Sequence, residues 1–246
     1  MKADPTAQAT LLELQAQDSL LNQLQHRKNT LPELARIAEL EARAKELDGQ
    51  RIEHDTAVSD LTRAQKKADA EVEQVKARRT RDEERLNSGA LSNPKDLSSL
   101  QHELVALERR ISTLEDDELE IMEQLEEAQA RLTNVQGDLD TVKTELAEQI
   151  AARDAAIAVL DEQAAGAQVE RGSSAAGVPA DLIALYDKLR GQYGLGAAAL
   201  RARRCEGCRL EINGADLREL AAQPEDEVLR CPECSRILVR TAESGL

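Results

Sequence analysis

A repeat of apolar residues spaced alternately three and four positions apart runs from Leu97 to Leu160. Sixteen of its nineteen positions are apolar, and the polar ones are Glu118, Gln149 and Arg153. A heptad pattern sustained over this length is typical of a coiled coil, because a helix on a globular core carries a shorter and wider apolar stripe. The pattern therefore predicts one continuous helix, about 95 Å long at 1.5 Å per residue, packed along a partner helix.

A second, less regular heptad seam occupies residues 37–86, where ten of fifteen positions are apolar. The segment between the seams, residues 87–96, contains a glycine and Pro94 and cannot continue the helix. Asn93, Pro94 and Asp96 have the order of an N-cap, a first-turn proline and a capping-box acid. The two seams therefore predict a helical hairpin whose tip lies at about residues 87–96.

A short connection makes neighbouring helices antiparallel, so the residue numbers of facing seam positions should add up to a constant. Leu86 with Leu97, and further pairs along both seams, give the same value of 183. The same relation places Gln65 opposite Glu118. A polar layer of this kind fixes the register of a coiled coil at some cost in stability. The alternative is that both side chains point to solvent.

The chain upstream of Pro32, where a kink or restart of the helix is expected, is rich in leucine at residues 11–24. These leucines lie beyond the end of the second seam and need another partner. The apolar segment 181–190 is the candidate, and Tyr186 is expected at that junction. Residues 166–180 are rich in Gly, Ser and Ala, which predicts a linker. The predicted domains are a coiled-coil hairpin at 1–165, a linker at 166–180 and a C-terminal helix with a zinc ribbon at 181–246.

The composition agrees with a rod and excludes several other folds. The chain contains no Phe or Trp, while 41% of its residues are apolar and 32% are charged. Large globular cores normally contain aromatic side chains, so a sandwich, barrel or doubly wound sheet is not expected. The net charge is −15, and residues 1–171 carry nearly all of it. An acidic rod repels polyanions, so any nucleic-acid contact is expected near the C-terminus.

The sequence indicates a cytoplasmic protein. It contains no apolar stretch long enough for a transmembrane helix, and its first ten residues lack the pattern of a secretory signal. All four cysteines fall between positions 205 and 234. This clustering fits a reducing compartment better than a disulfide framework.

The cysteines form two C-x2-C pairs separated by twenty-two residues, and they are Cys205, Cys208, Cys231 and Cys234. This spacing supplies four thiolates for one tetrahedral zinc ion. Gly207 suits the backbone of the first turn, and amides around each turn can stabilise thiolate charge. Four cysteines leave no open position on the metal, so the site is expected to be structural. A redox dithiol pair is the alternative, and iron would use the same ligands.

Short strands are expected around the cysteines, at 199–203, 228–230 and 236–240, with a short helix at 214–222. Together they predict a zinc ribbon whose small core should unfold without metal. The fold class is thus mainly α, a long antiparallel coiled-coil hairpin plus a small ribbon of short antiparallel β-strands.

Three segments in this order resemble a known bacterial family: Asn-Pro-Lys-Asp at the hairpin tip, Asp-Leu-Ile-Ala-Leu-Tyr-Asp-Lys-Leu-Arg at 181–190, and Cys-Pro-Glu-Cys-Ser-Arg-Ile-Leu at 231–238. The chain resembles the C4-type zinc-ribbon, coiled-coil family over nearly its whole length. The resemblance implies a non-enzymatic adaptor or chaperone with the four cysteines as zinc ligands. Some relatives bind the sigma factor sigma-54, flagellar or secretion components, or a flagellin messenger RNA, and sigma-54 is not carried over here. The chain has Ser235 where glycine is usual and Val239 where an aromatic residue is often found.

Two basic clusters are candidate contact surfaces. The ribbon cluster lies around the cysteine pairs and consists of Arg201, Arg203, Arg204, Arg209 and Arg236. It is suited to phosphate, although it also compensates the negative charge of a zinc centre with four thiolates. The tip cluster consists of Arg78, Arg79, Arg81 and Lys95. A run of charges on a coiled coil is most often a solvated face, and the acidic run at 115–127 has the same interpretation.

The sequence contains no recognisable nucleophile–base arrangement or phosphate-binding glycine loop, and a two-helix hairpin encloses no pocket for catalysis. We therefore expect no enzymatic activity, no small-molecule substrate and no membrane association. The expected function is that of a zinc-binding adaptor for protein partners, linked to transcription or assembly. The alternative is a nucleic-acid-binding protein that uses the arginine-rich ribbon.

Overall fold

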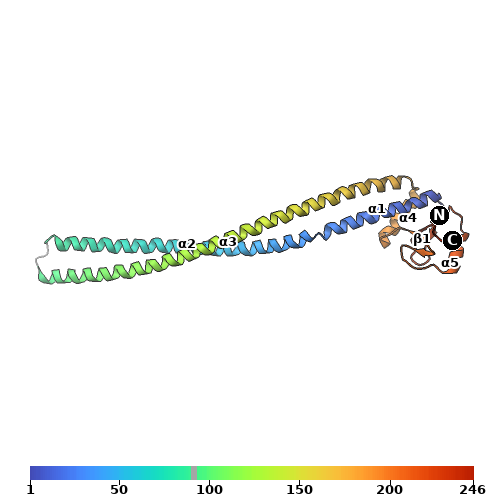
Figure 1. Cartoon of the computed structure of the whole chain (residues 1–246). Coiled ribbons are helices and arrows are strands. Elements are labelled where there is room, and N and C mark those ends of the chain that lie inside the picture. The colour runs from blue at the N-terminus through green and yellow to red at the C-terminus, as the bar shows by residue number, and fades with distance from the viewer. Residues whose placement is uncertain (90–92) are drawn as a thin grey trace. The chain divides into compact units, whose positions relative to one another are not determined.

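The computed structural model describes residues 1–89 and 93–246, and helices make up most of it (Figure 1). Residues 90–92, within the predicted hairpin tip at 87–96, lie outside the described residues. The elements are, in chain order, α1 (Pro5–Asn29), α2 (Pro32–Asn87), α3 (Pro94–Ala176), α4 (Ala180–Tyr193), β1 (Ala197–Arg201), β2 (Arg204–Cys205), α5 (Gly214–Ala222), β3 (Leu229–Arg230) and β4 (Ile237–Val239). The predicted fold class, mainly α with a small sheet at the C-terminal end, is confirmed.

The chain divides into two compact units, and the division cuts across α3. The hairpin unit is residues 35–150, which includes most of α2 and the first part of α3. The ribbon unit combines residues 1–34 with residues 151–246. The N-terminal helix α1 therefore groups with the C-terminal elements, whereas the sequence placed it in the hairpin domain.

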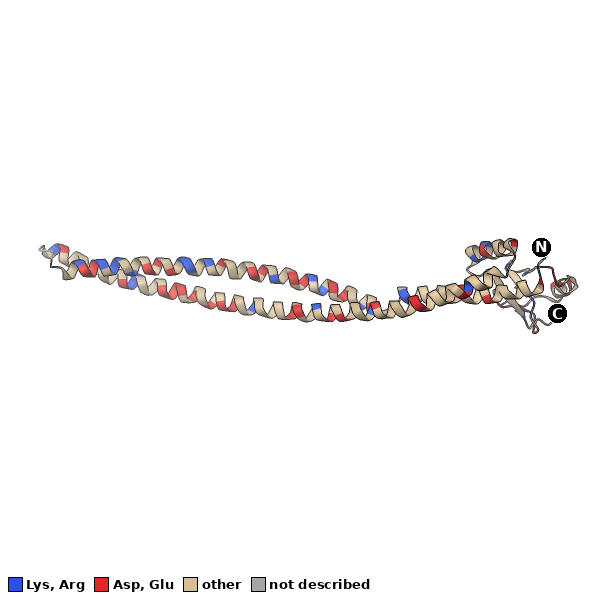
Figure 2. Ribbon diagram, turned by 90° about the horizontal axis from the view of Figure 1, so that it is seen from above, with Lys and Arg blue, Asp and Glu red and all other residues tan. Residues whose placement is uncertain are grey.

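Helices α2 and α3 of the hairpin unit run antiparallel (Figures 1 and 2). Arg36 of α2 pairs with Glu145 of α3 at 2.6 Å between Nη2 and Oε1. Further along α2, Lys76 pairs with Glu115 at 2.8 Å between Nζ and Oε1. As the residue number increases along α2, the number of its partner on α3 decreases, which is the antiparallel order that the seam pairing predicts.

The buried side chains of the hairpin unit all belong to the predicted heptad seams. On α2 they are Ile37, Leu40, Leu47 and Val72. On α3 they are Leu100, Leu107, Ile111, Leu114, Leu125, Ala128 and Leu139. Gln65 and Glu118, the predicted polar layer, are both half-buried. Asp69, one helical turn beyond Gln65, raises the pKa of Glu118.

The helix boundaries follow local signals in the sequence. Helix α1 ends at Asn29 and α2 begins at Pro32, so the restart expected at this proline is confirmed. At the other break, the Lys95 amide donates to Oδ1 of Asn93 at 3.1 Å, and α3 begins at Pro94. A side-chain acceptor before a first-turn proline satisfies a backbone donor that the helix itself cannot.

The linker predicted at 166–180 is wrong over most of its length, because α3 continues as helix to Ala176. The heptad repeat extends past its predicted end to Ala167, which is buried. Nearby, Gln17 of α1 donates to Glu170 of α3 at 2.6 Å between Nε2 and Oε2. A glycine inside a helix costs only about 1 kcal/mol relative to alanine, so packing against α1 outweighs the glycines of this segment.

The ribbon unit has a core shared by α1, α4 and the sheet. Its larger members are Leu11, Leu14, Leu182, Tyr186, Leu189, Ile237 and Val239. The leucines of α1 therefore pack against the apolar segment of α4, and Tyr186 is fully buried at this junction. Both predictions are confirmed.

The sheet has the strand order β2-β1-β4-β3. The outer pairs, β1 with β2 and β3 with β4, are antiparallel as expected, but the central pair β1 and β4 is parallel. A parallel pair needs a long crossover connection, and the chain between β1 and β4 includes α5. Strand β1 ends at Arg201, two residues before its predicted end, because Ala202 and Arg203 have positive φ angles of 48° and 63°, which lie outside the β region.

Alternate residues of the sheet face two different cores, as the two-residue period of a strand requires. Ala197 and Ile237 face α1 and α4. Leu200 and Leu238 face a second core that contains two of the cysteines, Cys205 and Cys231, together with Ile212 and Leu229. The sheet therefore connects the helices of this unit directly to the cysteine cluster.

Candidate metal centre and ribbon surface

The four cysteines predicted as metal ligands come together in the ribbon, with all Sγ atoms within 4.8 Å of one another. Two pairs join the two C-x2-C turns: the Sγ atoms of Cys205 and Cys234 lie 3.9 Å apart, and so do those of Cys208 and Cys231. A disulfide requires about 2.05 Å. Four sulfurs at about 2.3 Å from a tetrahedral zinc ion lie roughly 3.8 Å from one another. The cluster therefore has the dimensions of a zinc site.

The two C-x2-C turns have the same backbone construction. The Arg209 amide donates to the Cys205 carbonyl at 2.7 Å, and the Ser235 amide donates to the Cys231 carbonyl at 2.9 Å. Arg209 and Ser235 also have left-handed φ angles of 63° and 58°. This backbone conformation favours glycine, which gives a physical reason for the glycine that the resemblance implies at the position of Ser235.

Gly207 is required for space rather than for an unusual backbone angle. Its φ is not positive, unlike the expectation that glycine supplies a special turn conformation. A Cβ atom at this position would lie 3.0 Å from Cβ of Ala198 and 3.2 Å from Cδ of Arg236. The first cysteine turn therefore packs closely on strand β1 and on the second turn.

The thiols differ in how readily they ionise. Burial raises the pKa of Cys205, although the amides of Cys208 and Gly207 act in the opposite direction. Burial also raises the pKa of Cys231. For Cys234, burial is outweighed by hydrogen bonds from the backbone and side chain of Arg236 and from neighbouring thiols, which lower its pKa to about 7.

Four thiolates cannot share such a site without a cation. Zinc, when bound, supplies the positive charge that keeps the thiols deprotonated. The four cysteines would hold the ion and leave no open position for substrate. The donor set and its dimensions thus fit one structural zinc ion.

Comparison with known proteins agrees with this geometry. The CT398-like coiled coil hairpin domain matches residues 14–194. The chain belongs to this family. A C4-type zinc ribbon domain matches residues 204–238, which include all four cysteines. The chain thus matches the models of both modules seen in the structure.

Relatives of this CT398-like protein share its full length. The protein MT2288 of Mycobacterium tuberculosis is 36% identical over 240 residues, which cover 98% of each chain. A solved structure from Mycobacterium smegmatis is also 36% identical, with a TM-score of 0.86 over 98% of this chain and 100% of its own. CT398 of Chlamydia trachomatis is 16% identical with a TM-score of 0.68 over 96% and 98% of the two chains, and it supports the fold alone.

The ribbon arginines of the CT398-like protein fall into two groups. Arg236 is structural: its Nε donates to the Leu195 carbonyl at 3.2 Å, its Nη2 donates to the Tyr193 carbonyl at 3.1 Å, and its guanidinium lies 5.3 Å from the centre of the Tyr193 ring. Arg201 pairs with Glu243 at 2.9 Å between Nε and Oε2. Within the described residues, no hydrogen bond or ion pair occupies the guanidinium groups of the remaining three, which are Arg203, Arg204 and Arg209.

The tip cluster is also divided. Arg78 forms an ion pair with Glu103 of α3, and Arg79 pairs with Glu83 and Glu108. The pairs with Glu103 and Glu108 join α2 to α3, and the pair with Glu83 lies within α2. Two members are exposed and have no ion pair among residues 1–89 and 93–246, and they are Arg81 and Lys95.

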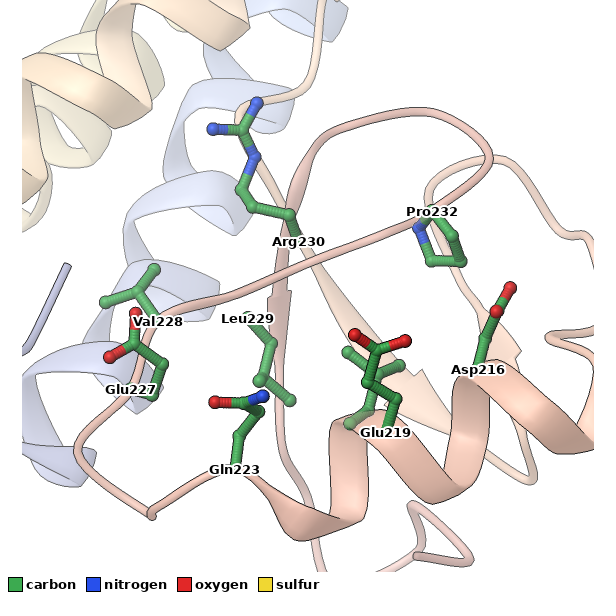
Figure 3. Close-up of a pocket in the computed structure, with 9 residues that line it drawn as sticks. Asp216, Glu219, Gln223, Glu227, Val228, Leu229, Arg230 and Pro232 are labelled. Atoms are coloured by element: carbon green, nitrogen blue, oxygen red, sulfur yellow. The ribbon is translucent and has the colours of Figure 1, made fainter.

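A shallow pocket of about 380 Å³ lies between α5 and the segment that includes β3. In Figure 3, Asp216, Glu219 and Gln223 rise from α5 toward this segment. Asp216 accepts a hydrogen bond from the Asn213 side chain at 2.7 Å. The carboxylate of Glu227 at the rim pairs with the N-terminal amine at 2.6 Å. Two of the pocket's three carboxylates are therefore engaged within the protein.

One polar cluster of the ribbon unit was not found from the sequence. Asp18 of α1 is fully buried, and Arg171 of α3 and Arg190 of α4 both contact its carboxylate. Gln15, one turn earlier, accepts the Gly196 amide at 2.8 Å where the chain enters β1. In the sequence, Gln15 and Asp18 are recognisable only as two of several polar residues inside the leucine-rich stretch 11–24.

None of the helices in the described part of the chain is both long enough and apolar enough to span a membrane.

Proposed function

We propose that this CT398-like protein is a non-enzymatic adaptor that binds protein partners, with zinc as the element that folds its ribbon. The observation that carries this proposal is the exposed surface of the hairpin unit. A two-helix hairpin buries only its seam, and apolar side chains outside the seam stay exposed on it: Ile52, Val105, Leu119 and Met122. Apolar surface of this kind, set among charged residues, favours contact with another protein.

The metal centre supports a structural role for zinc. Its four thiols leave no coordination position for a substrate or an activated water. The cysteine core lies on one face of a sheet whose other face packs on α1 and α4. Metal binding therefore stabilises the platform on which these helices pack. Four thiols that must stay reduced to bind zinc support a reducing compartment such as the cytoplasm.

Nucleic-acid binding is the second candidate, and one observation favours it. Arg203, Arg204 and Arg209 flank the first cysteine turn along the chain, and within the described residues their guanidinium groups have no hydrogen-bond or ion-pair partner. They are suited to phosphate contacts. Against this mode, Tyr193 is the exposed aromatic side chain of the ribbon unit, and the guanidinium of Arg236 already occupies one face of its ring, where a base would stack.

Affinity purification of the tagged, zinc-loaded full chain distinguishes the two candidates. Lysate is divided into nuclease-treated and untreated samples, and the R203Q/R204Q/R209Q variant is analysed beside the wild type. An adaptor retains the same stoichiometric protein partner in all samples, and the complex reforms from purified components. Loss of every partner on nuclease treatment, together with RNA or DNA that the triple variant no longer retains, would reject the adaptor.

A further inference from the structure

Two large apolar side chains on α3 lie outside the heptad seam. Leu119 is 58% exposed and Met122 is 43% exposed, although the seam beside them is closed by Leu125, which is 8% exposed. Leu119 and Met122 are three residues apart, so they lie on the same face of the helix. The packing of α2 against α3 does not use them.

These side chains line a shallow groove of about 500 Å³ within the hairpin unit. Gln65 of α2 forms one wall. The other wall comes from α3 and consists of Leu119, Met122, Glu123, Leu125, Glu126 and Gln129. The groove therefore has an apolar centre with carboxylates at its edge.

On the α3 side, the charge beside the groove has one sign. On the α2 side, Arg63 and Lys67 pair with Asp60 and Glu71 of their own helix, and Lys66 has no ion pair among the described residues. Eight acidic residues and no basic residue occupy positions 112–130, and they are Glu115, Asp116, Asp117, Glu118, Glu120, Glu123, Glu126 and Glu127. Among the described residues, only Glu115 and Glu127 form ion pairs, with Lys76 and Arg131. The acids around the apolar centre thus leave most of their charge uncompensated, in contrast to the paired charges nearer the tip (Figure 2).

We propose that this groove binds an amphipathic helix of a partner protein, with Leu-like side chains on one face and Lys or Arg on both sides of that face. The inference rests on the adaptor function and names its binding surface. A helix laid along the groove would bury Leu119 and Met122 and form a local three-helix bundle. Its basic flanks would face the unpaired acids, which gives charge complementarity over the full length of the site.

Charge also argues against the other occupants. A second copy of the chain would bring the same acidic run to the groove, and like charges would oppose each other. Among the basic residues of a second copy, Arg63, Lys67, Arg78 and Arg79 already pair with acids of that copy. Anionic lipid and nucleic acid are repelled by the same acids.

A designed peptide tests this surface even before the natural partner is identified. The probe is a labelled helical peptide of about 20 residues that contains only Leu at heptad seam positions and Lys elsewhere. A matched peptide carries Glu in place of Lys. Fluorescence anisotropy with the zinc-loaded full chain should show saturable binding of the Leu/Lys peptide, weakened by salt, and no binding of the Leu/Glu peptide.

Variants of the groove provide the decisive comparison. L119Q/M122Q should weaken binding of the Leu/Lys peptide by about tenfold or more, and E123Q/E126Q should weaken it and reduce its salt dependence. V105Q changes another exposed apolar residue of α3, 49% exposed, and should leave binding unchanged. Because these side chains are exposed, all variants should keep the wild-type melting temperature.

Equal affinity of wild type and L119Q/M122Q for the Leu/Lys peptide would overturn the proposal, because the peptide would then bind through the acidic residues alone. A change in sedimentation of the protein by itself in L119Q/M122Q would also overturn it, since a second copy would be the occupant. Either outcome rejects this groove and leaves the adaptor function standing, because affinity purification of partners tests that function separately.

Discussion

The hydroxyl of Tyr186 donates a 2.7 Å hydrogen bond to Oδ2 of Asp18, which lies 168 residues earlier in the chain. Both side chains are fully buried. Burial, followed by the bond to Asp18, raises the pKa of Tyr186, so the hydroxyl stays protonated and continues to donate. The other carboxylate oxygen of Asp18 contacts Arg171 at 2.7 Å and Arg190 at 3.1 Å. A single acid thus ties α1 to both α3 and α4 within the ribbon unit.

Removing the charge of Asp18 should strongly destabilise this unit. Asp18→Asn removes the buried carboxylate that both Arg171 and Arg190 contact, and we expect a loss of about 3 kcal/mol in the free energy of unfolding. Tyr186→Phe removes one hydrogen bond and should cost about 1–2 kcal/mol. Urea denaturation followed by tyrosine fluorescence or circular dichroism measures both.

The matched control is Asp187→Asn. Asp187 also pairs with Arg171, at 3.3 Å, but its side chain is 48% exposed. An exposed pair contributes less than about 1 kcal/mol, so this variant should be close to wild type. Comparable losses for the variants at positions 18 and 187 would contradict the importance given to the buried acid.

The hairpin unit should respond to pH through Glu118. A hydrogen bond with Asp69, then burial and repulsion from Asp69, raise the pKa of Glu118 above its ordinary value of 4.5. A raised pKa means that the stability contributed by this group is fully present below 4.5 and is lost as pH rises through the folded-state value. At neutral pH both carboxylates are ionised and repel each other.

Glu118→Gln should therefore raise the melting temperature at pH 7, because the amide supplies a donor to Asp69 and removes one negative charge. The difference from wild type should shrink at pH 3, below the raised pKa of Glu118, because the wild-type side chain is then also uncharged. Glu120→Gln, an exposed position on the same helix, is the control. An increase that is equally large at both pH values would show that the acid pair is not its cause.

Zinc removal should unfold the ribbon and spare the hairpin unit. Residues 35–150 contain no cysteine, whereas Cys205 and Cys231 are part of the ribbon core. Cys231→Ser should abolish stoichiometric zinc binding and make the ribbon sensitive to protease, while most helical circular dichroism remains. Glu206→Gln, an exposed change within the first cysteine turn, should retain one zinc per chain. A chelated protein with a protease-resistant ribbon would refute the structural role of the metal.

The ribbon arginines should separate into structural and dispensable residues. Arg236→Gln loses two bonds to backbone carbonyls and the contact with the Tyr193 ring, and should cost about 1–2 kcal/mol. R203Q/R204Q should change stability by less than about 0.5 kcal/mol. Thermal melts of the three proteins decide this point. Equal destabilisation by both sets of changes would mean that Arg203 and Arg204 have structural partners.

Much of the hairpin follows from the sequence because a heptad seam is a local and repeated signal. The two seams predict which side chains of α2 and α3 are buried, and the buried residues of the hairpin unit all belong to them. The heptad repeat also continues to Ala167, inside the glycine-containing segment for which the sequence predicts a linker. Whether a glycine-containing segment stays helical depends on what packs against it, and α1 comes from the opposite end of the chain.

The zinc ligands were also predictable, since two C-x2-C pairs leave few alternatives. The parallel pairing of β1 with β4 was not, because strands of five and three residues carry no signal for their neighbours. Arg236 was grouped with the contact arginines, since residue type alone does not distinguish a guanidinium that binds carbonyls from one in solvent. Leu119 and Met122 did carry a signal: they are large apolar residues outside the seam.

The central claim is that this chain works by binding a protein partner, and titration calorimetry of the zinc-loaded full chain with its purified partner tests it most directly. The partner is the protein recovered after nuclease treatment. We predict saturable binding that R203Q/R204Q/R209Q leaves unchanged and L119Q/M122Q weakens. No binding to any recovered protein, together with tight and salt-sensitive binding of RNA or DNA that the triple arginine variant abolishes, would contradict the account.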